Sequence, residues 1–508
     1  MSAKTQAEYL EIPGASERLY NEDIAPLKQR TWGWYQVFCM WMSDVHSVGG
    51  YLFAASLFAL GIQAWQVLIC LIVGIVLVMF LTNWVAKPGV DLGVPYPVVC
   101  RLSFGVFGAN IATFIRGMIA VAWYGIQTYV ASKALIVVIL KFFPELVLYE
   151  KLYFVGLSYL GWVAFLVMWV AQFFVFYKGM KAITVFIDWA GPGVYAVMFA
   201  LAAWIVYKAG WNNIGFALAE VKYTGWAAAW QMLVAIALVV SYFSGPMCNF
   251  SDFSRFAHNM PDVKKGNFWR LPINFIAFSL VTVITTSGTF AVFGQYIHDP
   301  VEVVARIDNT TAAVIGAATF MIATIGINIV ANFVSPAYDF STIWPKHINF
   351  LRGGMIAAVG SVAVLPWHLF NSPQVIHYTL DTLGACIGPL YGTLVADYFW
   401  VKHSYVIPRD LYREDPQGAY WYQNGWNPLA IRSLITGAIV GLLFVFIPAL
   451  DFLGAFSWAI SALVAAVTFT RTMRSSGVAA RRVELERVRA EQTKAAGEEL
   501  VVPEVKLF

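Results

Sequence analysis

Charge is scarce in this chain. Only 12% of its 508 residues are Asp, Glu, Lys or Arg, whereas 59% are hydrophobic. An average soluble domain carries about 25% charged residues, so the composition excludes an ordinary soluble protein and indicates a membrane protein. Uninterrupted apolar runs such as residues 67–86 and 154–177 agree with this, because a membrane-spanning helix needs about 20 such residues.

Cysteine and the common cofactor motifs are scarce or missing as well. The five cysteines lie apart and show no CxxC spacing, so neither a disulfide framework nor a zinc site is expected. The sequence contains no GxxxxGK[ST], GxGxxG or HExxH motif. We therefore expect no cofactor, no metal site, no nucleic-acid partner and no enzyme chemistry. The first 30 residues contain no apolar stretch, so a cleavable signal is not expected either.

The apolar runs predict an all-α integral membrane protein with about twelve transmembrane helices. The expected cores are residues 35–59, 65–85, 107–134, 154–177, 183–207, 228–248, 271–294, 311–335, 354–370, 376–400, 430–449 and 452–470. Lys and Arg concentrate in alternate loops, for example at Lys178, Arg255 and Lys402. By the positive-inside rule this places both termini in the cytoplasm of a cell whose plasma or inner membrane holds the protein. Residues 1–30 and 471–508 are then cytoplasmic segments.

Two of these spans are interrupted by polar residues and helix breakers. The first contains His46, Ser47 and the pair Gly49–Gly50, and the sixth contains SGPMCN at 244–249. Interrupted spans at matching places in two halves are the best sequence pointer to a transporter binding site. Because the second break comes five spans after the first, the pattern predicts the LeuT-type arrangement of two inverted five-helix repeats. These repeats would occupy residues 31–208 and 228–401, followed by two additional helices in 430–470.

Polar side chains also occur at helical spacing within other spans. Trp123 and Gln127 are four residues apart and therefore share one helix face, where a flat ring beside an amide suits a planar heterocycle. Asn328 and Asn332 form a second such pair, for which hydrogen bonding between helices is the simpler interpretation. A tryptophan at this spacing can equally belong to the core or face lipid. The third pair, His377 and Asp381, has no assigned role.

Five stretches resemble one transporter family when they are taken together. They are MWM-x-x-VH near 40–46, AWYGIQT (122–128), NFSDFSRF (249–256), ANFVSPAYDFS (331–341) and GPLYGTLVADYF (388–399). The chain resembles the nucleobase–cation symporter family from about Lys28 to Arg471. Members of that family carry purines, pyrimidines, allantoin, hydantoins and some vitamins, so the resemblance implies a symporter that takes up such a ring by alternating access.

The resemblance also implies roles for particular residues. The substrate ring would stack on Trp123, with Gln127 and Asn332 hydrogen-bonded to its polar edge. Phe243, where relatives often have Trp, would cover the other face of the ring. Ser47 would contribute a polar group and Leu380 would limit access. Phe243 and Ser47 are smaller than the usual residues, so the identity of the heterocycle stays open.

The coupling cation is a second point of departure from the family. Sodium-using relatives bind the ion through carbonyls that match Ser43, His46 and Ala323, together with two adjacent hydroxyls. The hydroxyl positions are Gly326 and Ile327 here. Because sodium needs oxygen ligands, we favour proton coupling through Asp44 and His46, since ionisable groups inside a membrane often mark proton relays.

Several alternatives stay open from the sequence. Asp44 could instead pair with Arg116 or Lys133 and serve only to hold helices together. The protein could be an ion-independent facilitator or a channel for small polar solutes, although no charged ring or repeated filter motif is present. A membrane enzyme or a sensor has less support, because no catalytic constellation and no further domain is visible.

Overall fold

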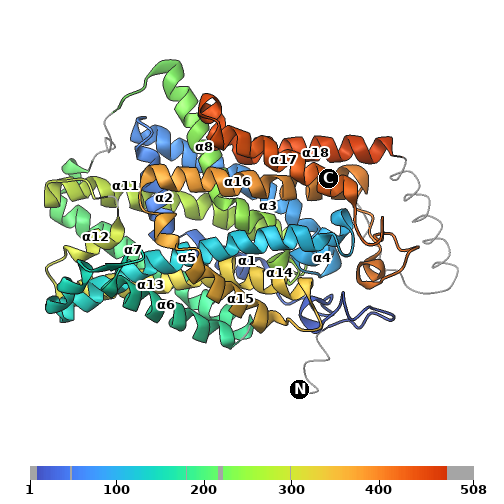
Figure 1. Ribbon diagram of the computed structural model, residues 1–508. Coiled ribbons are helices and arrows are strands. Elements are labelled where there is room, and N and C mark those ends of the chain that lie inside the picture. Colours follow the sequence, from blue (N-terminus) through green and yellow to red (C-terminus); the bar gives the residue numbers. More distant parts are fainter. Residues whose placement is uncertain (1–8, 46–47, 179, 215–220, 298, 477–508) are drawn as a thin grey trace.

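The structure is a computed structural model that describes residues 9–45, 48–178, 180–214, 221–297 and 299–476. Nearly all of its regular structure is helical (Figure 1). The α-helices are α1 (Trp34–Val45), α2 (Val48–Phe58), α3 (Ala64–Leu92), α4 (Tyr96–Phe104), α5 (Ala109–Phe142), α6 (Tyr159–Tyr177), α7 (Met180–Ala209), α8 (Gly225–Cys248), α9 (Ser251–Ser254), α10 (Met260–Phe268), α11 (Asn274–Phe293), α12 (Pro300–Ala305), α13 (Thr310–Ile329), α14 (Ser335–Ile343), α15 (Phe350–Ala363), α16 (Pro373–Val395), α17 (Pro428–Phe446) and α18 (Ser457–Ser475).

Shorter elements connect these helices. The 3-10 helices are η1 (Glu22–Ile24), η2 (Pro144–Glu150), η3 (Trp211–Asn213), η6 (Pro366–His368), η8 (Pro408–Tyr412) and η9 (Pro448–Phe456). The π-helical segments are η4 (Trp269–Ile273), η5 (Val330–Val334) and η7 (Ala396–Val401). The strands are β1 (Tyr153–Phe154) and β2 (Leu157–Ser158).

Nine helices in the described part are long and apolar enough to cross a membrane. They are Ala64–Leu92, Ala109–Phe142, Tyr159–Tyr177, Pro192–Ala209, Gly225–Cys248, Met260–Phe293, Thr310–Ile343, Pro428–Phe446 and Pro448–Ser475. Their outer faces expose large apolar side chains, among them Val163, Val167 and Phe174 of α6. Lipid tails cover such an apolar face without the free-energy penalty that water would impose. The predicted all-helical membrane architecture is confirmed.

The remaining three predicted spans are not among these nine helices. The α1–α2 pair matches the first span, α15 the ninth and α16 the tenth. Helices α3, α8 and α11 pack together, while α5 lies against α6, α13 and α14. The last two helices, α17 and α18, pack on α16 along one edge of the bundle (Figure 1). The exact limits of the two five-helix repeats stay a prediction.

The interruption of the first span is described only at its flanks. Helix α1 ends at Val45 and α2 begins at Val48, while His46 and Ser47 lie outside the described residues. The side chains of Ser43 and Asp44 are also outside the described part.

The break predicted at 244–249 in the sixth span is placed too early. Helix α8 continues through Gly245 and Pro246 and ends at Cys248. The chain leaves the helix at Asn249 and Phe250, after which α9 begins. A proline inside a helix removes one backbone hydrogen bond, and its ring crowds the preceding turn. Helix α8 nevertheless continues past Pro246, and the interruption comes at Asn249 and Phe250.

The predicted start of the fourth span at residue 154 is wrong by a few residues. A two-residue turn at Val155 and Gly156 joins β1 to β2, and both turn residues have positive φ, 50° and 82°. Such a pair defines the hairpin turn that suits the twist of antiparallel strands. The Ser158 side chain then accepts a hydrogen bond from the Gly161 N–H and caps α6.

The segment before the first span closes one end of the bundle. Arg255 donates to the carbonyl oxygens of Asp23 and Ala25 at 3.0 and 2.7 Å, and Arg101 donates to that of Leu19 at 2.8 Å. Both arginines are buried. Because a buried guanidinium needs acceptors, these contacts hold the N-terminal segment against the helix ends.

Close helix packing at Gly392 gives a first prediction. A Cβ at this position of α16 would lie 2.0 Å from the carbonyl oxygen of Ala462 in α18. Overpacking of this kind costs about 1–3 kcal/mol, so we expect Gly392→Ala to lower the thermal unfolding temperature of the purified protein. Gly193→Ala is the matched control, since a Cβ there meets no atom within 4 Å. Equal unfolding temperatures for the two variants would contradict this packing.

Candidate substrate-binding site

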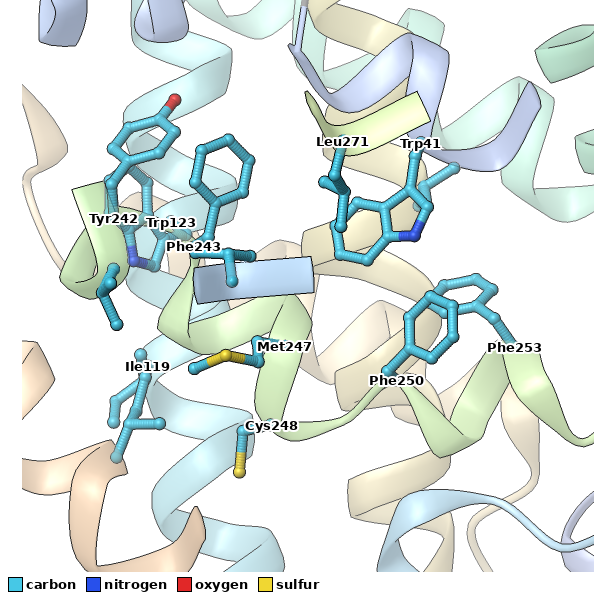
Figure 2. Packing of buried hydrophobic residues seen from close by; sticks show 14 of the residues in the cluster. Trp41, Ile119, Trp123, Tyr242, Phe243, Met247, Cys248, Phe250, Phe253 and Leu271 are labelled. Atoms are coloured by element: carbon cyan, nitrogen blue, oxygen red, sulfur yellow. The ribbon is translucent and has the colours of Figure 1, made fainter. Parts of the chain in front are cut away.

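An aromatic cluster surrounds Trp123 in the middle of α5. The Tyr242 ring of α8 lies edge-on to the indole, with ring centroids 5.5 Å apart, and the Phe370 ring also lies edge-on to it at 5.9 Å. Phe53 of α2 stacks on Tyr242 at 4.4 Å. Figure 2 shows Tyr242 next to Trp123. Helices far apart in the sequence thus gather their rings around one indole, which is 8% exposed.

The aromatic residue that α8 presents to Trp123 is Tyr242 rather than its neighbour Phe243. The Phe243 ring packs edge-on against Phe275 of α11, with centroids 5.6 Å apart, and is 1% exposed. Sequence reasoning missed Tyr242, because consecutive helix residues point about 100° apart and the rotation of α8 is not visible in the sequence. Whether Phe243 covers a bound ring stays a prediction.

Gln127 lies one turn beyond Trp123 and directly beside the interrupted first span. Its side chain is 1% exposed, and a Cβ added at Gly49 would lie 2.8 and 2.9 Å from the two polar atoms of the Gln127 amide. Glycine at position 49 therefore lets the α2 backbone approach the carboxamide. Within the described part of the chain, Gln127 Oε1 has no hydrogen-bond partner.

The amide pair of the eighth span forms part of a hydrogen-bonded network. Asn328 Nδ2 lies 3.0 Å from the Tyr124 carbonyl oxygen, 3.0 Å from Thr128 Oγ1 and 2.5 Å from Gln172 Oε1. Asn332 Nδ2 donates to Asn328 Oδ1 at 3.1 Å. Asn328 thus joins α13 to α5 and α6. This agrees with the prediction that the asparagine pair forms hydrogen bonds between helices. Gln172, which sequence reasoning missed, provides the α6 end.

Asn332 itself lies in the π-helical segment η5. A π-helical turn inserts an extra residue into an α-helix and often occurs at functional sites. Here it separates α13 from α14, and it places Asn332 one network step from Tyr124 and Thr128 of α5. These two residues follow Trp123 and Gln127 directly in sequence. The network therefore connects Asn332, through Asn328, to the part of α5 that carries Trp123 and Gln127. Whether the three side chains contact one ligand stays a prediction.

The predicted cation-site residues of α13 are all buried. Ala323 is 1% and Ile327 3% exposed. The Gly326 and Ile327 carbonyl oxygens accept the Val330 N–H at the start of the π turn, and neither residue has a side-chain oxygen. The other predicted ligands, Ser43 and His46, fall outside the described side chains and residues. The cation site as a whole therefore stays a prediction.

Leu380, His377 and Asp381, which the sequence analysis also named, have contacts with residues other than Trp123. The Leu380 carbonyl oxygen accepts from Ser241 Oγ at 3.0 Å, which links α16 to α8. His377 Nε2 is 3.0 Å from Ser56 Oγ. Because that hydroxyl donates to the Phe53 carbonyl at 2.6 Å, His377 Nε2 is the donor in their contact. Asp381 faces the α17–α18 connection near Gly454.

The two cations considered as partners of Asp44 have other described contacts. Arg116 Nη2 donates to Asn249 Oδ1 at 2.9 Å, and the Lys133 ammonium lies 4.9 Å from the centre of the Tyr129 ring. The side chain of Asp44 is not described, so its pairing stays a prediction.

A cavity of about 580 Å³ leads toward the aromatic cluster. It is lined by α2, by the start of α16 and by Phe370, which contacts Trp123. Lys133 and Asp299 add opposite charges to its wall. Burial raises the pKa of Asp299, which precedes α12, and the nearby Lys133 ammonium lowers it again.

Comparison with known proteins decides the family. Residues 24–461 match the family described as permeases for cytosine/purines, uracil, thiamine and allantoin. The chain belongs to this permease family. It is 33% identical over 462 residues to an allantoin permease of Bacillus subtilis, covering 90% of this chain and 94% of that one. A purine-uracil permease of Arabidopsis thaliana is 31% identical, covering 83% of this chain and 70% of the relative.

Solved structures confirm the transporter fold. The chain superposes on Mhp1, a nucleobase-cation-symport-1 family transporter in a closed conformation with bromovinylhydantoin bound, with a TM-score of 0.73 at 19% identity. The match covers 92% of this chain and 99% of Mhp1. MhsT in complex with L-phenylalanine gives a TM-score of 0.54 at 12% identity, over 86% of this chain and all of that one. The predicted family and the LeuT-type fold are confirmed, and the chain is a permease rather than an enzyme.

Two of the stretches that resemble this permease family hold the fold together. Trp41 Nε1 donates to Asn267 Oδ1 at 2.7 Å, and its ring stacks on Phe250 at 5.2 Å (Figure 2). Ser251 and Ser254 donate to the carbonyl oxygens of α3 residues 85 and 86 at 2.8 Å each. The first span, α3 and the segment after the α8 break are thus fastened to one another.

The close approach of Gly49 to Gln127 can be tested. We expect Gly49→Ala to push the Gln127 amide out of position and to raise the KM for transport, because the new methyl group cannot fit at 2.8 Å. The same substitution in a Gln127→Ala background should have a much smaller effect, since the clash is then removed. An equal effect in both backgrounds would contradict the contact.

Proposed function

We propose that this permease is a secondary active symporter that carries a planar N-heterocycle of the nucleobase, allantoin or hydantoin class. One observation supports this most directly: the Gln127 carboxamide oxygen is buried within the described structure, has no donor there, and lies one turn from the Trp123 indole. A buried acceptor without a donor costs about 1–3 kcal/mol. A ligand that supplies an N–H to Oε1 recovers this free energy.

The chemistry of the surrounding groups favours rings that contain amide-like N–H and C=O groups. The indole face of Trp123 provides a stacking surface, and Gln127 reads the polar edge of the ring. Asn332, anchored by Asn328, is the second amide of the proposed site. A ring that lacks an N–H group would leave Gln127 Oε1 unpaired, so the site selects against it.

The named relatives support the same class of ligand. They include an allantoin permease and a purine-uracil permease, and the Mhp1 structure holds a hydantoin. Further roles carried over from the family belong to the proposal alone: Phe243 covers the ring, Ser47 contributes a polar group and Leu380 limits access. In alternating access, the bundle of α1–α2, α3, α8 and α11 moves against α5 and α13.

We further propose that protons drive uptake and that both termini face the cytoplasm. Gly326 and Ile327 provide no side-chain oxygen for sodium, whereas Asp44 and His46 provide titratable groups beside the first break. The cytoplasmic placement rests on the alternating Lys and Arg content of the loops. Ion-independent facilitated transport is the alternative.

The proposed ligand contacts predict a loss of binding. We expect Trp123→Ala and Gln127→Ala each to weaken the binding of the transported heterocycle at least tenfold, equivalent to about 1.4 kcal/mol. Isothermal titration or a scintillation proximity assay on purified protein measures this. Trp189→Ala, which removes a side chain that is 79% exposed, is the control and should bind normally. Normal binding by both site variants would remove these residues from the site.

The proposed coupling predicts uptake that follows protons. Proteoliposomes with an imposed pH gradient, inside alkaline, should accumulate the heterocycle, and a sodium gradient at equal pH should not. Asp44→Asn should abolish the pH-driven accumulation and leave binding intact. Accumulation that follows sodium and ignores pH would contradict the proposal, and uptake that only equilibrates would favour a facilitator.

A further inference from the structure

A buried polar cluster lies two helical turns from the proposed substrate site. Arg116 precedes Trp123 by seven residues on α5, and Asp339 follows Asn332 by seven residues along η5 and α14. Seven residues of α-helix span about 10 Å. The two helices that carry the substrate-site residues therefore also carry this charged pair.

The cluster contains the cation Arg116 and the carboxyl groups of Asp252 and Asp339. Asp252 receives hydrogen bonds from the described residues and Asp339 receives none. Arg116 Nη2 donates to Asn249 Oδ1 at 2.9 Å and to the Ala331 carbonyl oxygen at 3.4 Å. Asn249 Nδ2 donates to Asp252 Oδ2 at 2.9 Å, and the Tyr96 N–H donates to Asp252 Oδ1 at 2.8 Å. Both oxygens of Asp252 therefore have donors. Asn249 also contacts Ser335 Oγ.

Asp339, in contrast to Asp252, receives no hydrogen bond from the described residues. Its side chain is completely buried, and neither of its carboxyl oxygens has a hydrogen-bond partner within the described part of the chain. An ionised carboxylate in such a place is costly enough that the group neutralises instead. The two donors around Asp252 favour its charged form, and the lack of described donors around Asp339 favours the neutral acid there.

Arg116 offers what an ionised Asp339 would need. Its Nε and Nη1 atoms are buried and also lack partners in the described structure, and Arg116 interacts electrostatically with Asp339. A carboxylate can accept a charge-assisted hydrogen bond from either of these N–H-bearing nitrogen atoms. The cluster thus contains two donor atoms of Arg116 and two acceptor atoms of Asp339 that lack partners in the described structure. They are not hydrogen-bonded to each other in this conformation.

The other titratable groups around Asp339 do not compensate a charge on it. Asp252 interacts with it as a like charge, and Tyr96, Cys100 and Cys248 are the remaining titratable neighbours with an electrostatic interaction. Arg116 is the cation among these described neighbours, so its movement toward Asp339 would stabilise the deprotonated form.

We propose that Asp339 binds the coupling proton, and that its release is linked to a change of partner by Arg116. The proton is taken up from the side of higher proton activity onto the Asp339 carboxylate and leaves to the other side. When it leaves, the carboxylate accepts a hydrogen bond from an unpartnered N–H group of Arg116. Because Arg116 also holds Asn249 at the α8 break and the Ala331 carbonyl beside Asn332, this exchange reaches the substrate site. The inference rests on proton symport and adds a proton-binding residue to Asp44 and His46.

Asp339→Asn, which imitates the protonated side chain, is the test. In proteoliposomes with an imposed pH gradient, we expect substrate accumulation to fall to an inside-to-outside ratio of about one, while binding and substrate counterflow change less than threefold. Asp381→Asn is the matched control, because it neutralises a half-buried aspartate that lies near Gly454, away from this cluster, and it should retain accumulation. Retained accumulation in Asp339→Asn would overturn the inference.

The outcomes separate the two proposals. If the wild-type protein shows no proton-driven accumulation, the proposed coupling fails whatever the variant does. If Asp339→Asn cannot be purified, infrared difference spectra of the wild-type protein between high and low pH provide the second measurement. We expect the carboxylic-acid C=O band of a buried aspartic acid to disappear when substrate is released at high pH. Asp339→Glu should shift this band, and an unshifted band would overturn the assignment.

Discussion

The side chain of Asn328 sets the geometry on which the proposed site depends. A carboxamide within a bilayer cannot be satisfied by bulk water, so it must find protein partners. Asn328 finds them on α5 and α6, through Tyr124, Thr128 and Gln172, and it accepts from Asn332. These bonds fix α13 in height and rotation relative to α5. This constraint helps to place the π turn that carries Asn332 relative to the helix that carries Trp123 and Gln127.

The groups that the fold leaves unsatisfied are as informative as those it satisfies. The side-chain amide nitrogens of Asn328, Asn332 and Gln172 all have acceptors, whereas Gln127 Oε1 and both oxygens of Asp339 have no partner within the described residues. Buried polar groups are almost always paired in native proteins. The Gln127 acceptor, one helical turn from the Trp123 indole, and the Asp339 carboxyl group, near the partly unpartnered Arg116 guanidinium, are the places where we propose that a substrate and a proton bind. Both positions lie on the same two helices.

Much of the fold could be predicted from the sequence, because apolar length determines which segments cross a membrane. The pairing of Trp123 with Gln127 was also predictable, since four-residue spacing is set by the helix itself. The choice between Tyr242 and Phe243 was not, because it depends on how α8 rotates in the packed bundle. The break in the sixth span was predicted too early for a related reason. Pro246 indicates that the helix can end nearby, but α8 ends only at Cys248, before the tertiary contacts of α9 begin. The isolation of Asp339 is a property of its neighbours and left no sequence signal.

The structure of the protein with allantoin or uracil bound, determined by cryo-electron microscopy, tests the central claim most directly. We expect density for a flat ring on the face of the Trp123 indole, with a ring nitrogen within hydrogen-bonding distance of Gln127 Oε1. A ligand found instead in the cavity beside Lys133 and Asp299, with Gln127 Oε1 still lacking a donor, would contradict the account.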